Sequence, residues 1–315
     1  MVINLYISDE VKKYYIENNT YYRMVNLEQF IKYILPTKYI YNISDFENAN
    51  ICLWNMELND NEKLIDTKIN ILISIENINY WAIKKQHLDW PGYIHYSKYG
   101  NYDDNKIDIY LYNHINKIDY INNSLAIPFI YIYINYFLNN KHKIKPEKNL
   151  CSSQKKFCLN INKSKLNTDI NNIETLLNNI DNVDNISIYD DYIKDKSCYH
   201  SIELINILNK YKFIICFENS YDDSYITEKI FNCFYANTIP LYKGSNNITK
   251  YINNNTFIDF NNVNDNNNNL ELIQKINNDD ELYNNYINNE KINDYYNNEN
   301  YISQYINYIE KKICC

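Results

Sequence analysis

Polar side chains that suit an anionic ligand lie between a predicted strand and a predicted helix in the second half of the chain. The apolar run from Phe213 to Phe217 predicts a strand, and Glu218 and Asn219 follow at its carboxyl end. A helical pattern then begins near Tyr225, so the unpaired N–H groups and positive dipole end of this helix face the same crevice. Phosphates bind well at such a position, and in open α/β sheets this crevice is where ligands lie.

Lys229 adds a cation to this crevice. It falls in the first or second turn of the predicted helix, where a positive charge opposes the helix dipole. A diphosphate bound at the helix start would remove this conflict, which indicates a phosphate site, although a solvated lysine on a helix surface is the alternative. With only 3 Gly, the chain has neither a G-x-G-x-x-G nor a G-x-x-x-x-G-K loop, so a nucleotide must be bound by another device.

Strands and helices alternate along most of the chain, which predicts βαβ units with parallel sheets. Residues 141–148 are polar and contain Pro146, and they are the best candidate linker. We therefore predict an α/β protein with two Rossmann-like domains that face a cleft, residues 1–148 and 149–290, and a C-terminal helical tail, residues 291–315. The predicted strands are 2–7, 51–54, 69–75, 156–161, 187–189, 213–217 and 239–242, the predicted helices are 171–180, 201–210, 226–236 and further helices from Leu270 on, and 124–140 is extended or helical.

Composition and charge exclude several classes of protein. The formal net charge of -8 disfavours a nucleic-acid-binding protein, whose affinity comes mostly from neutralising phosphates. The longest apolar run, Ala126 to Leu138, has 13 residues and is interrupted by Asn135, whereas a membrane span needs about 20. The first residues lack the pattern of a signal peptide, and none of the 8 Cys forms a C-x-x-C pair, which favours reduced thiols. We expect a soluble, cytoplasmic protein without a nucleic-acid partner or a transmembrane anchor.

The motifs around the predicted crevice resemble the donor-binding signature of the α-1,3-fucosyltransferase family. The shared elements are F-E-N-S at 217–220, Y-x-T-E-K at 225–229 and T-x-P-x-x-x-G-S at 238–245, in the family's order and spacing. Weaker similarity extends over most of the chain. Residues 155–158 resemble the K-F-C strand that opens the family's second domain, 75–77 resemble its G-E-N element, and 126–129 resemble its R-x-P-L segment.

The resemblance implies a GT-B glycosyltransferase that uses GDP-fucose as its donor substrate. It also implies inverting transfer of fucose to a glycan or glycoprotein acceptor of the N-acetylglucosamine type. Residues 1–148 would then be the acceptor-side domain and 149–290 the donor-binding domain. No metal or other cofactor would be required, because a lysine and helix N–H groups can stabilise the departing GDP. We interpret Asp222 and Asp223 as part of a variable loop, not as metal ligands.

The same resemblance assigns roles to single residues. Glu76 would be the general base, and Lys229 would contact the donor diphosphate, which makes these two the expected catalytic residues. Glu228 would bind the ribose hydroxyls. The alternatives are a strand-end carboxylate for Glu76 and a charge favoured by the helix dipole for Glu228. The residues expected to bind the donor are Glu218, Asn219, Tyr225, Glu228 and Lys229.

The chain departs from the family pattern where the family has arginine. The family carries an Arg downstream of its K-F-C strand, whereas residues 163–170 contain none and the only Arg in the chain is Arg23. Lys163 or Lys165 would supply a point charge without the bidentate fork of a guanidinium. Ala126 also stands where the R-x-P segment has Arg. Two alternatives to a fucosyltransferase therefore stay open: a related transferase with another nucleotide sugar, and an inactive relative that retains the nucleotide site.

Overall fold

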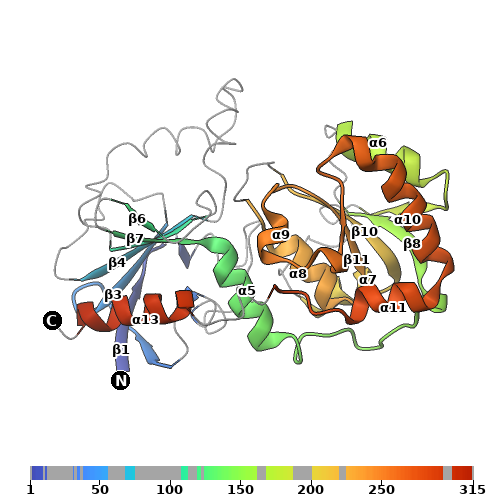
Figure 1. Cartoon of the computed structure of the whole chain (residues 1–315). Helices are drawn as coiled ribbons and strands as arrows, with labels where there is room; N and C mark the ends of the chain where they lie inside the picture. The colour runs from blue at the N-terminus through green and yellow to red at the C-terminus, as the bar shows by residue number, and fades with distance from the viewer. Residues whose placement is uncertain are drawn as a thin grey trace. The chain divides into compact units, whose positions relative to one another are not determined.

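The computed structural model describes residues 2–9, 11–12, 31, 34–35, 38–55, 68–74, 108–112, 119–121, 124–161, 168–186, 201–219, 225–293 and 300–313. The chain forms two compact units, which are unit 1 with Met1–Asn135 and Asn298–Cys315, and unit 2 with Tyr136–Asn297 (Figure 1). Each unit contains its own sheet. Among the described helices, none has both the length and the apolar character needed to cross a bilayer.

Unit 1 is built on the strands β1 (Val2–Ile7), β2 (Ile40–Ile43), β3 (Ile51–Asn55), β4 (Ile69–Ser74), β5 (Ile109–Tyr112), β6 (Asp119–Ile121) and β7 (Ser124–Pro128). They form one sheet in the order β2-β1-β3-β4-β5-β7-β6. Neighbouring strands are parallel, except that the edge strand β6 runs antiparallel to β7. Residues 51–54 and 69–73 are buried without alternation, as expected for strands covered on both faces.

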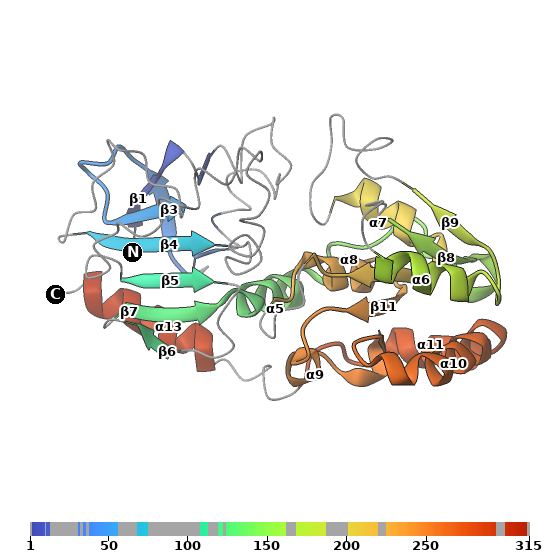
Figure 2. The same cartoon turned by 90° about the horizontal axis from the view of Figure 1, so that it is seen from above.

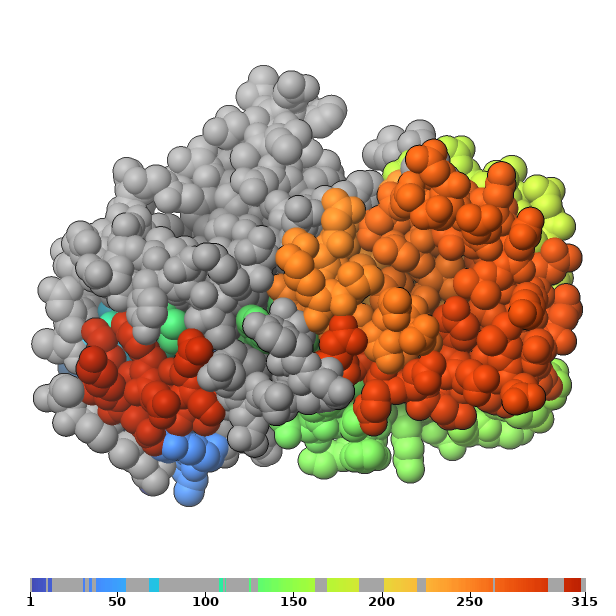
Figure 3. Space-filling view, viewed as in Figure 1, coloured from blue at the N-terminus to red at the C-terminus, as the bar shows by residue number. Residues whose placement is uncertain are grey.

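The last helix, α13 (Asn300–Ile313), belongs to unit 1 and packs against β4 and β7. Tyr305 and Ile309 form its buried side, and the Tyr305 hydroxyl donates a hydrogen bond of 3.0 Å to the backbone oxygen of Ile34. An ion pair of 2.7 Å between Lys312 and Asp108 adds a second attachment. The outer face of α13 lies at the surface, in red (Figure 3). The helical tail thus returns to the unit that holds the start of the chain.

Unit 2 has a parallel sheet of the strands β8 (Lys156–Asn160), β9 (Val183–Asn185), β10 (Tyr211–Phe217), β11 (Ile239–Lys243) and β12 (Ile258–Asp259). Their order is β12-β11-β10-β8-β9, with β10 at the centre. All residues of β10 are buried, because helices cover both faces of the sheet. The central strand therefore delivers the residues that follow Phe217 to the carboxyl edge of the sheet.

Unit 2 contains the helices α6 (Thr168–Leu177), α7 (Ile202–Leu208), α8 (Glu228–Tyr235), α9 (Ile248–Tyr251), α10 (Asn266–Asn278) and α11 (Asp280–Asn288), with short 3-10 turns at Ser152–Gln154, Asn254–Thr256 and Val263–Asp265. Alternate residues of β10, Phe213, Ile215 and Phe217, share a core with apolar residues of α6, α10 and α11. Helices α7 and α8 pack on each other and on β10. Figure 2 shows α10 and α11 side by side.

Helix α5 (Phe129–Asn140) follows β7 directly, so the segment 124–140 is extended first and helical afterwards. The change occurs at Pro128, which has no N–H to donate to a sheet. Within unit 2, the ring of Phe137 packs against three aromatic rings of α8. The partners are Phe231, Phe234 and Tyr235, with centroid distances of 5.7, 5.9 and 5.1 Å.

The structure confirms most of the predicted elements and corrects the start of one helix. The confirmed strands are β1, β3, β4, β8, β10 and β11, and the confirmed helices are α6, α7, α10, α11 and α13. Helix α8 begins at Glu228 and not near Tyr225, because Thr227 is extended (φ -115°, ψ -173°) and acts as the N-cap. The predicted strand 187–189 lies outside the described residues, and β9 is found at Val183–Asn185.

Candidate functional site

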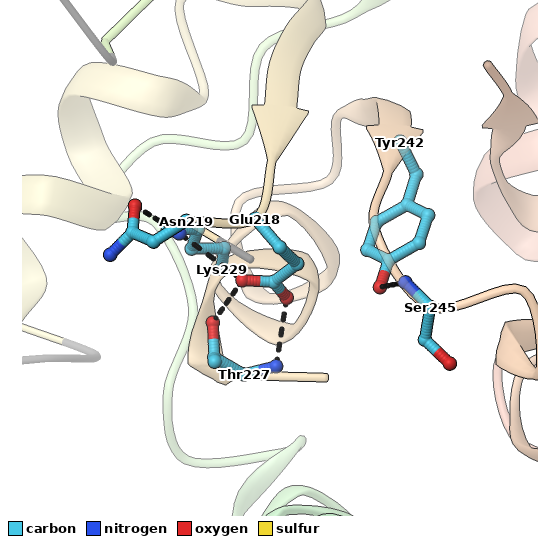
Figure 4. A network of polar contacts seen from close by, with 6 residues as sticks. All are labelled: Glu218, Asn219, Thr227, Lys229, Tyr242 and Ser245. Atoms are coloured by element: carbon cyan, nitrogen blue, oxygen red, sulfur yellow. Dashed lines mark hydrogen bonds and ion pairs between the residues drawn. The ribbon is translucent and has the colours of Figure 1, made fainter. Parts of the chain in front are cut away.

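The polar residues after β10 meet the start of α8 at the carboxyl edge of the sheet of unit 2. Phe217, the last residue of β10, is in register with Lys243, the last residue of β11. The backbone N–H of Glu218 donates a 2.8 Å hydrogen bond to the oxygen of Lys243, which continues the ladder by one residue. Figure 4 shows the residues gathered at this edge: Glu218, Asn219, Thr227, Lys229, Tyr242 and Ser245.

The Glu218 carboxylate is the centre of this network, and its side chain is 0% exposed. Its Oε1 accepts a hydrogen bond of 2.8 Å from the Thr227 backbone N–H, and its Oε2 accepts one of 2.7 Å from the Thr227 hydroxyl. The same Oε2 lies 3.1 Å from the Lys229 ammonium. A buried carboxylate is tolerated when it is paired and hydrogen-bonded in this way. The side chain of Glu218 therefore joins the end of β10 to the start of α8.

Lys229 is held from two sides in the first turn of α8. Its Nζ lies 3.1 Å from Glu218 Oε2 and 3.1 Å from Asn219 Oδ1, and its side chain is 16% exposed. Burial acts against the charged form, but the carboxylates of Glu218 and Glu228 outweigh it and raise the pKa of Lys229 above its usual value. The charged form of Lys229 is therefore favoured. An ammonium has three N–H donors, so two bonds within the protein leave one for a ligand oxygen.

The turn after β11 closes the network from the other side. A Cβ at Gly244 would lie 2.6 Å from Cγ of Glu218 and 2.5 Å from the hydroxyl oxygen of Tyr242, which is closer than real side chains come. The Ser245 backbone N–H donates to that hydroxyl at 3.1 Å. The Asn261 side chain accepts from the Gly244 N–H at 2.9 Å and donates to the Ser245 oxygen at 3.2 Å. The glycine of the T-x-P-x-x-x-G-S motif is thus needed for close packing on Glu218.

The structure brings five of the six predicted site residues together. Glu218, Asn219 and Lys229 contact one another, while Tyr225 and Glu228 are buried on either side of the N-cap Thr227. The roles of these residues in binding stay predictions. The sixth predicted residue, Glu76, lies outside the described residues, as do Lys163, Lys165, Asp222 and Asp223.

Two residues of the site were missed from the sequence. Thr227 precedes a helical pattern, which is the usual signal of an N-cap, but its hydroxyl donates to Glu218 and makes no capping bond to the helix. Lys243 forms an ion pair of 2.7 Å with Asp169, in the first turn of α6. No local pattern connects residues so far apart in the chain. The position of Lys243 at the carboxyl end of a predicted parallel strand could still have indicated it, because ligands bind at this edge of such sheets.

The arrangement suits an anion. The described residues contain no group of three or more His, Cys, Asp or Glu side chains that could hold a metal ion. Positive charge at this edge comes from Lys229 and Lys243, and α8 begins there with its positive dipole end. The exposed amide of Asn219 adds N–H donors beside Lys229. Such a set of groups can bind a phosphate and stabilise it as negative charge develops.

Comparisons with known sequences agree with this site. Residues 150–315, just over half of the chain, match the profile of glycosyltransferase family 10 (fucosyltransferase), C-terminal part. A putative fucosyltransferase of Acanthamoeba polyphaga mimivirus is 38% identical over 109 residues, which are 33% of this chain and 18% of that protein. The α-(1,3)-fucosyltransferase FucT of Helicobacter pylori is 43% identical over 51 residues, 16% of this chain and 11% of that protein. The chain thus spans less than a fifth of the length of these curated relatives.

Solved structures support the same fold over the whole chain. A crystal structure of an α1,3-fucosyltransferase with GDP superposes with a TM-score of 0.62 and 14% identity, over 100% of this chain and 91% of that chain. One with GDP-fucose gives a TM-score of 0.59 and 16% identity, over 99% and 90%. The predicted α/β fold of the GT-B type is confirmed, and so is the resemblance of the motifs. The chain belongs to glycosyltransferase family 10, the fucosyltransferase family.

Proposed function

We propose that this protein transfers fucose from GDP-fucose to a glycan or glycoprotein acceptor, with inversion at the anomeric carbon. The observation that carries the proposal is the Lys229 ammonium, held 3.1 Å from both Glu218 and Asn219 at the start of α8. These residues lie within the F-E-N-S and Y-x-T-E-K motifs of the family to which the chain belongs. Two similar solved structures are described with GDP and with GDP-fucose, which supports this donor.

In the proposed reaction, Lys229 stabilises the leaving group. The bond between the fucose anomeric carbon and the β-phosphate oxygen breaks, and GDP leaves as an anion. A fixed cation and helix N–H groups stabilise such a charge as it develops, because they need not reorganise. The Thr227 hydroxyl is used by Glu218 and makes no capping bond to the first turn of α8. With Lys229 and the helix N–H groups to stabilise the departing GDP, the proposal needs no metal ion.

The nucleotide is proposed to lie along the end of β10 and the start of α8. Asn219 is exposed there and offers side-chain N–H donors next to Lys229. Glu228, the first residue of α8, would accept hydrogen bonds from the ribose hydroxyls, and Tyr225 would line the pocket. Both assignments follow the family motif, and the position of the two residues beside the N-cap of α8 is compatible with them.

The general base is proposed to be Glu76, which follows β4 in unit 1. Inversion requires a base on the face opposite the leaving group, where it takes the proton of the acceptor hydroxyl as the new bond forms. Such a base must come within about 3 Å of the hydroxyl in the closed complex, directly or through one water. The assignment rests on the match of residues 75–77 to the family's G-E-N element.

A nucleotide screen tests the proposed donor. Thermal unfolding is measured with GDP, UDP and CMP, because a ligand that binds only the folded state at a hundred times its Kd stabilises it by about 2.7 kcal/mol. We expect a rise in Tm with GDP alone, followed by GDP release and fucosylated product when GDP-fucose and an N-acetylglucosamine-containing acceptor are supplied. A response to UDP or CMP only would indicate another nucleotide sugar. GDP binding without turnover of any GDP-sugar would indicate an inactive relative.

We also propose that the enzyme works in a reducing compartment, the cytoplasm. The five described cysteines are free, and four of them, Cys52, Cys158, Cys216 and Cys233, are buried. Unpaired buried thiols are typical of proteins that are kept reduced. Fractionation of cells that express the chain, with an antibody against it, would contradict this proposal if the protein were found only in the secretory fractions.

A further inference from the structure

We propose that Glu218 is a positioning residue, which acts on the diphosphate only through Lys229 and does not contact the ligand itself. This inference rests on the proposed function, because it concerns the same donor site. It differs from the expectation that the carboxylate at the end of β10 is a ligand-binding group. Its basis is the burial of Glu218, the use of both its oxygens and the packing of Gly244 against it.

The first argument is that neither oxygen of Glu218 is available to a ligand. The side chain is fully buried, Oε1 accepts from the Thr227 N–H, and Oε2 accepts from the Thr227 hydroxyl and from Lys229. A ligand hydroxyl that replaced one of these donors would leave a buried polar group without its partner, at a cost of about 1–3 kcal/mol. Direct contact between Glu218 and a nucleotide is therefore unfavourable in this structure.

The second argument is that Glu218 fixes the ammonium of Lys229. A lysine side chain has a flexible stem of four carbons and loses roughly 2 kcal/mol of rotamer entropy when it is ordered. Here Glu218 and Asn219 hold Nζ at 3.1 Å each before any ligand is present. The ordering cost is thus met within the folded protein, and a diphosphate meets a cation that is already in place. Of the two partners of Nζ, Glu218 is the charged one.

The third argument is that Glu218 is itself held in place. Its carboxylate is bonded to the backbone of Thr227, directly before α8, so it cannot swing without breaking the start of the helix. On the other side, Gly244 leaves no room even for a methyl group beside Cγ of Glu218. The distance from the end of β10 to the Lys229 ammonium is therefore set by one rigid side chain, which is the arrangement that positioning requires.

The substitution Glu218→Gln separates positioning from support of the fold. Because the Thr227 N–H needs an acceptor, the amide oxygen of Gln should stay at the Oε1 position. The amide nitrogen then replaces Oε2, where the rotatable Thr227 hydroxyl can accept from it, whereas Lys229 faces a donor instead of an acceptor. The helix attachment is retained, and only the hold on Lys229 is lost. Thr256→Val is the control for lost stability, since it removes a buried hydroxyl that donates 2.6 Å to the Asn253 backbone oxygen and belongs to no part of the Glu218 network.

The experiment is a double-mutant cycle of Glu218→Gln and Lys229→Met, read by equilibrium binding of GDP, guanosine and pyrophosphate to the full chain. We expect Glu218→Gln to lower the affinity for GDP and for pyrophosphate roughly tenfold, which is the effect of one charge-assisted hydrogen bond. The affinity for guanosine should change by at most about twofold. In the Lys229→Met background, Glu218→Gln should change no affinity further. Thr256→Val should lower Tm without altering the ratio of GDP to guanosine affinity. If Glu218→Gln does not fold, Glu218→Asp replaces it, because the shorter carboxylate is also withdrawn from Lys229.

Additive losses in the double variant, or an equal loss of guanosine affinity, would overturn the inference and indicate that Glu218 contacts the nucleotide or only supports the fold. A wild-type protein that binds pyrophosphate but not GDP would contradict the proposed donor, while the pyrophosphate titrations would still decide the role of Glu218. A wild-type protein that binds neither would refute both proposals.

Discussion

Lys243, at the end of β11, forms an ion pair with Asp169 in the first turn of α6, with 2.7 Å between Nζ and Oδ2. The lysine side chain is 15% exposed and the aspartate 39%. Asp169 lies within residues 163–170, the stretch that contains no Arg although the family pattern that this chain resembles has one there. Lys243 therefore brings a second cation to the carboxyl edge of the sheet, where it pairs with the first turn of α6.

We expect Lys243→Met to weaken GDP binding several-fold, because the phosphates lose one of two nearby cations. Stability should fall by at most about 1 kcal/mol, since pairs near the surface contribute little. Isothermal titration with GDP measures the first effect and urea denaturation the second. Lys156→Met is the matched control, as Lys156 forms a similar pair of 2.6 Å with Asp184 but stands at the amino end of β8. Equal GDP affinity in wild type and Lys243→Met would remove Lys243 from the site.

Lys229→Met should reduce transfer about a hundredfold, which corresponds to roughly 3 kcal/mol of lost stabilisation of the departing diphosphate. It should also lower the free energy of unfolding by on the order of 3 kcal/mol, because Glu218 would remain buried without its cation. Adding Glu218→Gln should restore part of the stability and none of the turnover. Lys250→Met, an exposed lysine at the end of α9, is the control. Turnover close to wild type in Lys229→Met would refute the role assigned to it.

Gly244→Ala tests the packing behind the site. The added methyl group would lie 2.6 Å from Cγ of Glu218 and 2.5 Å from the Tyr242 hydroxyl oxygen, so both side chains must shift. We expect a loss of roughly 1–3 kcal/mol of stability, as for other overpacked sites. GDP affinity should also fall, because a displaced Glu218 moves Lys229. Thr249→Ala, at an exposed position of α9, should leave GDP affinity unchanged. Unaltered GDP binding in Gly244→Ala would show that Lys229 does not depend on this packing.

The sequence predicted the elements of the candidate site well, because β10, α8 and β11 each have a clear local pattern. It did not predict that Glu218 would be buried. That burial depends on Thr227 and Gly244, which come together only through the packing of α8 and the turn after β11. The expected role of Glu218 in binding the donor stays a prediction.

The start of α8 was predicted two to three residues too early, for a local reason. Tyr225 and Ile226 fit the apolar periodicity of the helix. The extended conformation of Thr227 nevertheless makes the helix begin only at Glu228. Periodicity reports which residues face a core and does not distinguish a helical turn from an extended segment that packs on the same core. The pair between Asp169 and Lys243 joins two elements distant in sequence and has no local signal at all.

Lys155 predicts a pH dependence of stability. It is buried, its Nζ donates to the Asn237 backbone oxygen at 2.5 Å, and burial lowers its pKa from 10.5 to about 7. Between these values the unfolded chain binds more protons than the folded protein, so this residue makes stability rise with pH. Below about pH 7 both states are protonated and the contribution of Lys155 becomes constant at its least favourable value.

The measurement is the free energy of unfolding in urea at about pH 7 and pH 9. Lys155 should raise the free energy of unfolding of the wild type by on the order of 2 kcal/mol over this interval. The slope of this free energy against pH is at most about 1.4 kcal/mol per pH unit for one group. Lys155→Met should lack this gain, whereas Lys156→Met, at an exposed neighbour, should retain it. Parallel pH dependences in wild type and Lys155→Met would mean that Lys155 is charged in the folded protein at pH 9.

Inverting fucosyl transfer is tested most directly by NMR of the product formed from GDP-fucose and an acceptor that contains N-acetylglucosamine, with GDP release followed in parallel. We predict a fucosylated acceptor whose anomeric configuration is opposite to that of the donor, with one GDP released for each fucose transferred. Glu76→Gln should bind GDP as wild type does and form no product, because the acceptor hydroxyl loses its base. A product of retained configuration, or undiminished transfer by Glu76→Gln, would contradict the account.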